Sequence, residues 1–373
     1  MIQICSPNHC TGCAACANIC PKQCIKMIED SKLGHFIPNI DQEKCVDCGL
    51  CQKTCPQNSE SDYQSPLQCF AAWEKDEGSY RTSSSGGAAS AFSRKILQEG
   101  GVVYGCAVQQ GTVKHIRVVE EKDLVLLKGS KYVQSLIEEQ LFVQVKKDLQ
   151  QGLAVLFIGT PCQIDGVRSF LKKKHYQNLY LVDIVCHGVP SQKCLDSHLR
   201  TQIPQKKNIT SFSFRENNEW TLRVYEQSKI IYHSSVMKDL YFFSFLRALS
   251  YKNSCYQCRY ARKERISDVT IGDFWGIGSL NIPEKPKNGL SLILVNTEQG
   301  SVLLDKVSES FYIEERNVDE AVAGNKQLRF PSRKHFARGL FCGLYNRIGF
   351  ELSAKIALFI DRIIYFILLK IKK

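Results

Sequence analysis

The sequence predicts an α/β fold, with a small cysteine-rich α+β domain followed by a larger domain built on a mixed, partly parallel sheet. Two cysteine runs, at 10–20 and 45–55, repeat with a period of 35 residues. Beyond a polar linker, short apolar runs alternate with helical patterns, which is typical of βαβ units. At 373 residues the chain exceeds the usual size of one domain. We expect domains at 1–60 and 67–330, and a basic, apolar tail at 331–373.

The two cysteine runs share the spacing Cys-x2-Cys-x2-Cys-x3-Cys-Pro, which matches the pattern of bacterial ferredoxins. In that pattern three closely spaced thiolates hold one [4Fe–4S] cluster, and the fourth reaches across to the other cluster. A structural zinc site or a disulfide knot is the alternative, but a duplicated run of four favours electron transfer. The pattern predicts two ligand sets: Cys10, Cys13, Cys16 and Cys55 for one cluster, and Cys45, Cys48, Cys51 and Cys20 for the other.

The larger domain begins after a polar linker at 58–66. Periodicity predicts a helix at 89–97, a strand pair at 102–108 and 113–119, and an amphipathic helix at 136–149. Two β–α units follow. The apolar run 154–158 predicts a buried strand that ends in Gly-Thr-Pro-Cys, with a helix to about residue 173. The run 179–185 ends in Cys-His-Gly, and Ser191 caps the next helix. Further strands are predicted at 269–276 and 291–296.

A third group of cysteines collects at the ends of these strands. Cys162 and Cys186 each come just past a predicted strand, and ligands gather outside the carboxyl ends of parallel strands. Because consecutive β–α units usually lie side by side, we expect the two thiols to be neighbours. Cys255 and Cys258 add a pair at ligand spacing, which predicts a third [4Fe–4S] site. A zinc site built on that pair is the alternative. We expect the remaining cysteines to be structural: Cys5, Cys24, Cys69, Cys106, Cys194 and Cys342.

A two-electron cofactor is expected beside the clusters, because clusters pass single electrons whereas most organic substrates accept pairs. The segment 81–87 offers a phosphate cradle, since its hydroxyls and glycines stand ahead of a helix N-terminus. A cation and an aromatic ring follow at 131–132. A plain helix cap and an ordinary helix start are the alternatives for the two segments. The candidate cofactor-binding residues are Ser84, Ser85, Gly86, Gly87, Lys131 and Tyr132.

The net charge and the cysteine content limit which classes of protein the sequence can represent. The formal charge of +12 counts thiols as neutral. Three clusters at about two negative charges each and a bound dinucleotide would leave only about +4. No zinc-finger, helix-turn-helix or stacking-aromatic pattern indicates a nucleic-acid partner. Eighteen cysteines behind no secretory signal are typical of a metal-binding protein in a reducing cytoplasm.

These segments, in this order, resemble the coenzyme F-420 hydrogenase/dehydrogenase beta subunit family with a ferredoxin domain fused at the front. The resemblance covers roughly residues 1–330, and its more specific marks are RTSSSGG (81–87), SKYVQS (130–135), GTPCQ (159–163), CHG (186–188) and SDVTIGDFWG (267–276). It implies an FAD-containing iron–sulfur reductase. The flavin would lie against the Ser-Gly-Gly and Ser-Lys-Tyr segments, near a cluster held by Cys162, Cys186, Cys255 and Cys258.

Together these observations predict an oxidoreductase that passes electrons between a ferredoxin-like donor or acceptor and an unknown two-electron substrate or partner enzyme. His187 and Asp273 stand at strand ends near the expected flavin and are candidate proton carriers. A ligand-flanking hydrogen-bonding residue and a loop-capping carboxylate are the alternatives for them. Two other functions stay open: a non-catalytic electron-transfer subunit, and an enzyme that uses coenzyme F-420.

The C-terminal tail is apolar and basic, but its longest uninterrupted apolar run has seven residues, Ile363–Leu369. A membrane span needs about 20 apolar residues, so this segment does not predict one. Three alternatives stay open: a helix packed on its own domain, a contact with the inner membrane surface, and docking of a partner.

Overall fold

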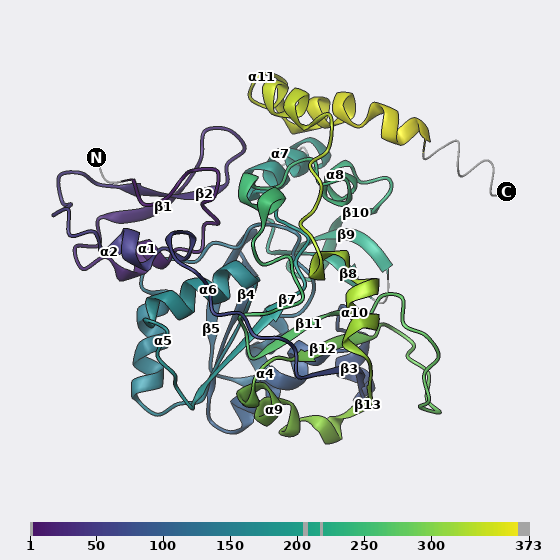
Figure 1. The fold of residues 1–373 in the computed structure, drawn as a ribbon. Helices are drawn as coiled ribbons and strands as arrows, with labels where there is room; N and C mark the ends of the chain where they lie inside the picture. Colours follow the sequence, from purple (N-terminus) through teal and green to yellow (C-terminus); the bar gives the residue numbers. More distant parts are fainter. Residues whose placement is uncertain (1–2, 204–207, 217–218, 365–373) are drawn as a thin grey trace.

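The computed structural model describes residues 3–203, 208–216 and 219–364 (Figure 1). Its N-terminal domain contains α1 (Ala15–Ile19), β1 (Ile25–Glu29), β2 (Phe36–Ile40), α2 (Leu50–Thr54) and the 3-10 turn η1 (Pro56–Asn58). β1 and β2 pair antiparallel, with Ile25 opposite Ile40. This small unit packs through α1 against α5 and α6 of the larger domain (Figure 1).

The larger domain is built on an eight-stranded mixed sheet in the order β13-β3-β12-β11-β7-β6-β4-β5. The four strands β11, β7, β6 and β4 run parallel, and the flanking strands pair antiparallel. This confirms the predicted α/β class with a partly parallel sheet. The strands are β3 (Gln68–Glu74), β4 (Val102–Gln109), β5 (Thr112–Val118), β6 (Val155–Gly159), β7 (Leu179–Ile184), β11 (Val269–Asp273), β12 (Ser291–Val295) and β13 (Phe311–Glu315).

Helices cover both faces of the sheet. α4 (Ala88–Gln98) and α9 (Glu298–Asp305) pack on one face, while α5 (Leu141–Gln150) and α6 (Pro161–Phe170) pack on the other. Side chains of a strand alternate between the two cores: Leu156 of β6 faces α4, whereas its neighbour Phe157 faces α5 and α6. The apolar runs of the central strands are therefore continuous because both of their faces are buried.

A second layer lies beyond one end of the main sheet. An antiparallel sheet of β8 (Ser211–Glu216), β9 (Glu219–Glu226) and β10 (Lys229–Ser235) shares a core with α7 (Gln192–Gln202), α8 (Leu240–Leu246) and α11 (Arg338–Ala357). The sequence did not predict these three strands. The short helices α3 (Glu77–Arg81) and α10 (Val318–Gly324) complete the larger domain.

Two predicted helix boundaries were wrong. The helix predicted from 136 begins at Leu141, because Leu136 instead forms a bridge to Lys114 of β5. The helix predicted to reach residue 173 ends at Phe170, because Lys172 and Lys173 adopt left-handed backbone conformations with φ of 58° and 53°.

The C-terminal helix α11 lies across α7 and α8 (Figure 1). It kinks at Gly349, where φ is 74°, and helical structure continues to Ile364. None of the described helices is long and apolar enough to cross a membrane. The candidate tail residues 365–373 lie outside the described part of the chain.

Candidate redox centre

The first predicted ligand set, which we call site I, consists of Cys10, Cys13, Cys16 and Cys55. The structure brings all four thiols together in the interior. Burial raises the pKa of Cys13 to about 12, and the neighbouring thiolates of Cys55 and Cys10 add to the rise. The pKa of Cys16 rises well above its usual range for the same reasons. Four clustered, buried thiolates need a cationic group among them, which is what an iron–sulfur core supplies.

The second set, site II, consists of Cys20, Cys45, Cys48 and Cys51. Cys20 and Cys48 lie close enough to Cys51 for their thiolates to add to the rise in its pKa that burial causes. Cys45 and Cys20 both lie beside Cys24. The exchange of one cysteine between the two runs, as the repeat predicts, therefore matches how the thiols group in space.

Two cysteines that we expected to be structural contact these sites. The Cys24 sulfur lies 3.4 Å from that of Cys20 in site II. Cys5 lies beside Cys10 and Cys55 of site I, and its thiol lowers the pKa of Cys10 to about 6 although burial opposes the change. Each predicted cluster site therefore has a fifth thiol at its edge, which the spacing of the runs did not indicate.

The third set, site III, consists of Cys162, Cys186, Cys255 and Cys258. β6 and β7 pair in parallel, with Gly159 directly opposite Asp183. Cys162 lies three residues after Gly159, and Cys186 lies three residues after Asp183, so both cysteines leave the sheet at the same level. Burial raises the pKa of Cys162 well above its usual range, and the thiolates of Cys186, Cys258 and Cys255 raise it further. The four thiols thus share one buried region, in agreement with the prediction made from the positions of Cys162 and Cys186 at the strand ends.

The spacing of these thiols bears on the zinc alternative. The described residues contain no group of three or more His, Cys, Asp or Glu side chains arranged around a single metal ion. A [4Fe–4S] cube holds its four ligating sulfurs farther apart than one ion does. The donor set of four thiols in a buried pocket fits the cluster.

Local structure explains how the loops of site III meet. Cys162 lies in the first turn of α6, which begins with Thr160 as N-cap and Pro161, and a helix N-terminus favours a thiolate. Gly188 has a φ of 125°, and a Cβ there would lie 2.3 Å from the ring of Tyr251. Only glycine permits this approach, which brings the strand end at Cys186 against the 3-10 turn η3 (Asn253–Gln257) that carries Cys255.

A buried ion pair fixes the loop that follows Cys258. Arg265 donates to Asp183 of β7 at 2.8 Å, and both side chains are at most 2% exposed. Arg265 also donates to the carbonyl of Tyr260 at 2.9 Å. The positive charge of Arg265 stabilises the thiolates of Cys186 and Cys258, which partly offsets the rise in their pKa that burial causes.

Site I and site III approach each other across α6. Gly166 lies one turn after Cys162, and a Cβ on Gly166 would lie 3.0 Å from the Cβ of Cys13. Tyr260 lies near both Cys162 and Cys13, and its hydroxyl donates to Asp165 at 2.8 Å. The N-terminal domain is therefore docked with its inner ligand set facing the third.

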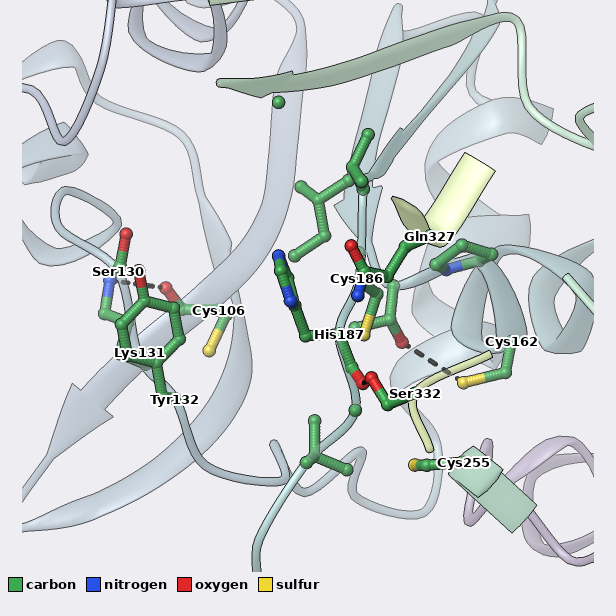
Figure 2. A pocket seen from close by; sticks show the side chains of 18 of the residues that line it. Cys106, Ser130, Lys131, Tyr132, Cys162, Cys186, His187, Cys255, Gln327 and Ser332 are labelled. Atoms are coloured by element: carbon green, nitrogen blue, oxygen red, sulfur yellow. Dashed lines mark hydrogen bonds between the residues drawn. The ribbon is translucent and has the colours of Figure 1, made fainter. Parts of the chain in front are cut away.

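One cavity of about 1220 Å³ joins these features. It lies at the carboxyl ends of the parallel strands, and its walls include the four cysteines of site III, residues 9, 11 and 12 of the site I loop, and the Ser/Gly segment before α4. Figure 2 shows His187 between Lys131 and Tyr132 on one side and Cys186 on the other. The cavity is large enough for a dinucleotide and has the placement expected in an α/β sheet.

The Ser/Gly segment presents polar groups to this cavity. Ser84 and Ser85 line it, and within the described part of the chain neither buried hydroxyl has a hydrogen-bond partner. A buried hydroxyl without a partner is unfavourable, so both are suited to a phosphate or other polar ligand. Gly87 also lines the cavity, but Gly86 does not. The glycines are required by packing: a Cβ on Gly86 would lie 2.1 Å from the Ala72 carbonyl, and one on Gly87 would lie 2.3 Å from the Glu74 carboxylate.

Lys131 and Tyr132 both line the cavity, in a loop and not at a helix start. The Lys131 ammonium donates to the carbonyls of Cys106, Leu127 and Lys128 at 2.7–3.0 Å, and burial lowers its pKa to about 8. Its main contacts are thus with the backbone of β4 and of the preceding loop. Tyr132 stacks on Phe245, with ring centroids 4.3 Å apart, which leaves it as part of an aromatic wall.

The two candidate proton carriers, His187 and Asp273, differ in how strongly other side chains engage them. His187 lines the cavity, and burial lowers its pKa while the Asp273 carboxylate opposes the change. Both oxygens of Asp273 accept from Nη1 of the buried Arg215 at 2.7 Å. Arg215 was not identified from the sequence, and no local motif marks it, because its partner is 58 residues away. Its guanidinium also lies 4.9 Å from the ring centroid of Trp220.

The cavity is strongly basic. Among the described residues that line it are eight Lys or Arg side chains and a single carboxylate, that of Asp273. Three of the cations, Lys326, Arg333 and Lys334, come from the segment that leads into α11. The lining is therefore suited to polyanionic ligands.

Comparison with known proteins agrees with both halves of this arrangement. Residues 153–321 match the family described as the C terminus of the coenzyme F420 hydrogenase/dehydrogenase beta subunit, and residues 9–59 match the 4Fe-4S dicluster domain. Residues 153–321 are therefore similar to the C-terminal domain of these beta subunits. A 4Fe-4S dicluster domain precedes them, which supports an iron–sulfur protein.

Individual relatives match shorter stretches. The coenzyme F420-dependent sulfite reductase of Methanocaldococcus jannaschii is 27% identical over 176 residues, which are 45% of this chain and 26% of that protein. One component of the ion-translocating oxidoreductase complex of Methanosarcina acetivorans is 42% identical over 50 residues, which are 13% of this chain and 17% of that component. This chain thus spans about a quarter or less of either relative.

A solved structure also aligns. A chain of the F420-reducing [NiFe] hydrogenase complex from Methanosarcina barkeri is 17% identical, with a TM-score of 0.46, and the alignment covers 72% of this chain and 94% of that chain.

Proposed function

We propose that this chain is an iron–sulfur, flavin-dependent oxidoreductase that passes electrons between a ferredoxin-like carrier and a two-electron substrate. The observation that carries the proposal is the single cavity in which the thiols of site III, the loop of site I and the unpartnered hydroxyls of Ser84 and Ser85 all meet. A substrate that enters this cavity lies within reach of both the cluster ligands and the phosphate cradle.

Each part of the cavity has a distinct task in this proposal. The clusters supply one-electron transfer, and FAD supplies the conversion between single electrons and a hydride equivalent. Ser84 and Ser85 hold the dinucleotide phosphates, and the ring of Tyr132 forms part of the wall beside it. His187 is the proton carrier, because it projects into the cavity, whereas Asp273 is engaged by Arg215 and orients that guanidinium.

The charge of the lining indicates an anionic substrate. Eight cations line the cavity, and they exceed the sum of one carboxylate, about two negative charges on a cluster at site III and two dinucleotide phosphates. Coenzyme F420 is one candidate, since the Methanocaldococcus jannaschii relative is a coenzyme F420-dependent sulfite reductase. Small oxyanions are another. We favour a cytoplasmic location, because exposed clusters require a reducing compartment.

Cofactor analysis of anaerobically purified protein tests this proposal. We expect about twelve iron and twelve sulfide, because three sets of four thiols are present, and one FAD per chain. Ser84→Asp combined with Ser85→Asp should remove the flavin by placing carboxylates against its phosphates, whereas the matched double Ala variant should only weaken its binding. Iron content should stay unchanged in both. Full flavin occupancy in the Asp variant would show that the dinucleotide binds elsewhere.

A non-catalytic electron-transfer subunit is the second candidate. It is favoured by the docking of a complete dicluster domain onto the cavity, since this arrangement also suits a chain that relays electrons to a partner enzyme. Turnover of the isolated protein with reduced ferredoxin and anionic acceptors separates the two. Flavin reduction without steady-state turnover of any acceptor would favour the subunit.

The outward face of α11 supports a further part of the proposal, contact with the anionic inner surface of the membrane. Its two carboxylates in the described segment 336–364 point inward: Glu351 pairs with His198, and Asp361 pairs with His335. Apart from Asn346, the exposed side chains of the segment are apolar or basic, and this charge pattern is complementary to anionic lipid headgroups. They include Phe336, Leu340, Arg347, Leu352, Lys355, Ile356, Phe359, Ile360, Ile363 and Ile364.

Vesicle flotation tests this contact. The protein should float with phosphatidylglycerol vesicles but not with phosphatidylcholine vesicles, and Phe359→Glu with Ile363→Glu should abolish the difference. Val302→Glu on the exposed side of α9 is the matched control. Absence of flotation together with a concentration-dependent dimer in sedimentation would show that a second copy covers this face instead.

A further inference from the structure

A buried lysine lies between site I and site III. Lys252 is only 4% exposed, and its ammonium donates to the carbonyl of Phe36 at 2.9 Å, a contact between residues 216 apart in the chain. Phe36 belongs to the N-terminal domain, and Lys252 belongs to the larger one. The side chain therefore crosses the interface between the two domains.

The surroundings place Lys252 next to both ligand sets. On one side, a Cβ on Gly12, which stands between Cys10 and Cys13, would lie 2.8 Å from the same Phe36 carbonyl. On the other side, the backbone carbonyl of Lys252 accepts from the amide of Cys255 at 3.0 Å. The charge is close enough to favour the thiolate of Cys10 and that of Cys255 alike.

Other charged groups near Lys252 are already engaged. Asp30 faces the same region, but its carboxylate accepts the backbone amides of Leu33 and Gly34 and lies 3.8 Å from His35. Burial and the nearby Lys252 lower the pKa of His35 to about 3, so that ring is neutral. Arg338 also lies near Cys255, and it donates to the carbonyl of Leu249 at 2.7 Å.

A buried ammonium is unfavourable without a compensating negative charge. No carboxylate among the described residues forms an ion pair with Lys252 within 4.0 Å. Two thiolate-bound clusters, each with about two negative charges, would supply that compensation from both sides. The position of Lys252 thus makes sense when sites I and III are both occupied.

We propose that Lys252 is a positioning residue that sets the reduction potentials of sites I and III together. This inference rests on the proposed function, because it requires a cluster at site III. A fixed positive charge stabilises the reduced, more negative state of a cluster and so raises its potential. Because Lys252 is shielded from solvent, this effect is weakly screened. Because the charge of Lys252 acts on both clusters, it raises both reduction potentials and keeps the difference between them small.

Redox titration monitored by electron paramagnetic resonance tests the proposal on the intact anaerobic protein. Lys252→Gln removes the charge but keeps a donor for the Phe36 carbonyl. We expect the potentials of sites I and III to fall by at least about 59 mV each, a tenfold change in a one-electron equilibrium. Site II should not shift, which makes it an internal control. Lys252→Arg keeps the charge and should keep both potentials near those of the wild type.

A matched surface control is Lys44→Gln. Lys44 lies near Cys24 at the edge of site II, but its side chain is exposed and pairs with Asp41, so water screens its charge and no potential should move measurably. Lys252→Gln with unchanged potentials at sites I and III would overturn the proposal. If Lys252→Gln loses iron from both sites while Lys252→Arg keeps it, the charge is required to hold the two clusters, which supports the proposal. Loss in both variants would show that packing alone matters and would overturn it.

The proposed function fails separately from this inference. About eight iron in the wild-type protein would remove site III and with it the proposed flavin-linked reductase. About twelve iron together with unshifted potentials in Lys252→Gln would leave that reductase intact and remove only the role of Lys252.

Discussion

Site I and site II have the same cysteine spacing but opposite surroundings. All four cysteines of site I are 7–9% exposed, and the site faces α6 of the larger domain. In site II only Cys51 is buried, Cys20 and Cys45 are half-buried, and Cys48 is exposed. The difference arises from docking, because Gly166 of α6 and the ammonium of Lys252 both approach site I.

Under the proposed function, this contrast gives a duplicated motif two tasks. The repeat predicts which thiols form each ligand set, and the packing of the two domains determines what each set can reach. In the proposed oxidoreductase the exposed site II exchanges electrons with the carrier, and the buried site I passes them on toward site III. The assignment depends on burial alone and can be tested site by site.

Loss of one ligand from each site gives the largest expected effect. Cys13→Ser and Cys48→Ser should each remove about four of about twelve irons, because a [4Fe–4S] cluster needs its full set of thiolates. Cys13→Ser should also abolish electron delivery from reduced ferredoxin to the cavity while leaving dithionite reduction of the flavin intact. Iron analysis and stopped-flow absorbance measure both properties.

Cys13→Ser and Cys48→Ser serve as controls for each other, because each removes one cluster and leaves the other in place. If site II is the entry, Cys48→Ser should block reduction by ferredoxin but leave dithionite reduction of the flavin intact. Wild-type transfer rates in Cys13→Ser would show that site I does not connect the carrier to the cavity, and the roles assigned to the two sites would then be wrong.

The sequence predicted these ligand sets because local spacing determines them. It also predicted that Cys162 and Cys186 would meet, since the parallel register of β6 and β7 follows from two consecutive β–α units. It did not predict Lys252, Arg215 or the sheet β8-β9-β10. Lys252 and Arg215 act on partners 216 and 58 residues away, and such contacts appear only once the domains and loops have packed. We expected glycine at position 87 because it lets a ligand approach the backbone. The structure gives a second reason, since the Glu74 carboxylate leaves no room for a Cβ on Gly87.

The buried pair of Asp183 and Arg265 gives the next largest effect. Asp183→Asn removes the carboxylate that pairs with the buried Arg265 guanidinium, which should lower the free energy of unfolding by about 3–5 kcal/mol. The loop of Cys258 should loosen, so site III should lose its iron. Sites I and II should keep theirs, because their cysteines lie in the N-terminal domain.

Denaturant unfolding and iron analysis measure this effect. Glu77→Gln, which breaks an exposed pair with Lys287, should change neither quantity measurably. Equal iron loss from all three sites in Asp183→Asn would show that the N-terminal domain depends on the larger domain more closely than the local spacing of its cysteines suggests.

A smaller effect is expected where α6 touches site I. Gly166→Val adds three carbons where even a single Cβ lies 3.0 Å from the Cβ of Cys13, so overpacking should cost about 1–3 kcal/mol. The signal of site I should change, and transfer to the cavity should slow, while site II stays as in the wild type. Gly343→Val is a suitable control, because a Cβ on Gly343 meets nothing within 4 Å. A site II signal that changes as much as that of site I would contradict the inward orientation of site I.

The smallest effect should appear at the outer face of site II. Val46 and Leu50 flank the exposed Cys48 and are themselves 58% and 38% exposed, respectively. They form an apolar rim suited to a transient carrier. Val46→Ser should raise KM for reduced ferredoxin by about two- to fivefold, since most single truncations at an interface cost less than about 1 kcal/mol. Iron content, kcat and reduction by dithionite should not change, because no cluster ligand is altered. Val302→Ser, on the exposed side of α9, is the matched control and should leave KM unchanged. If Val302→Ser raises KM and Val46→Ser does not, the carrier binds the larger domain, and the exposure of site II has another cause.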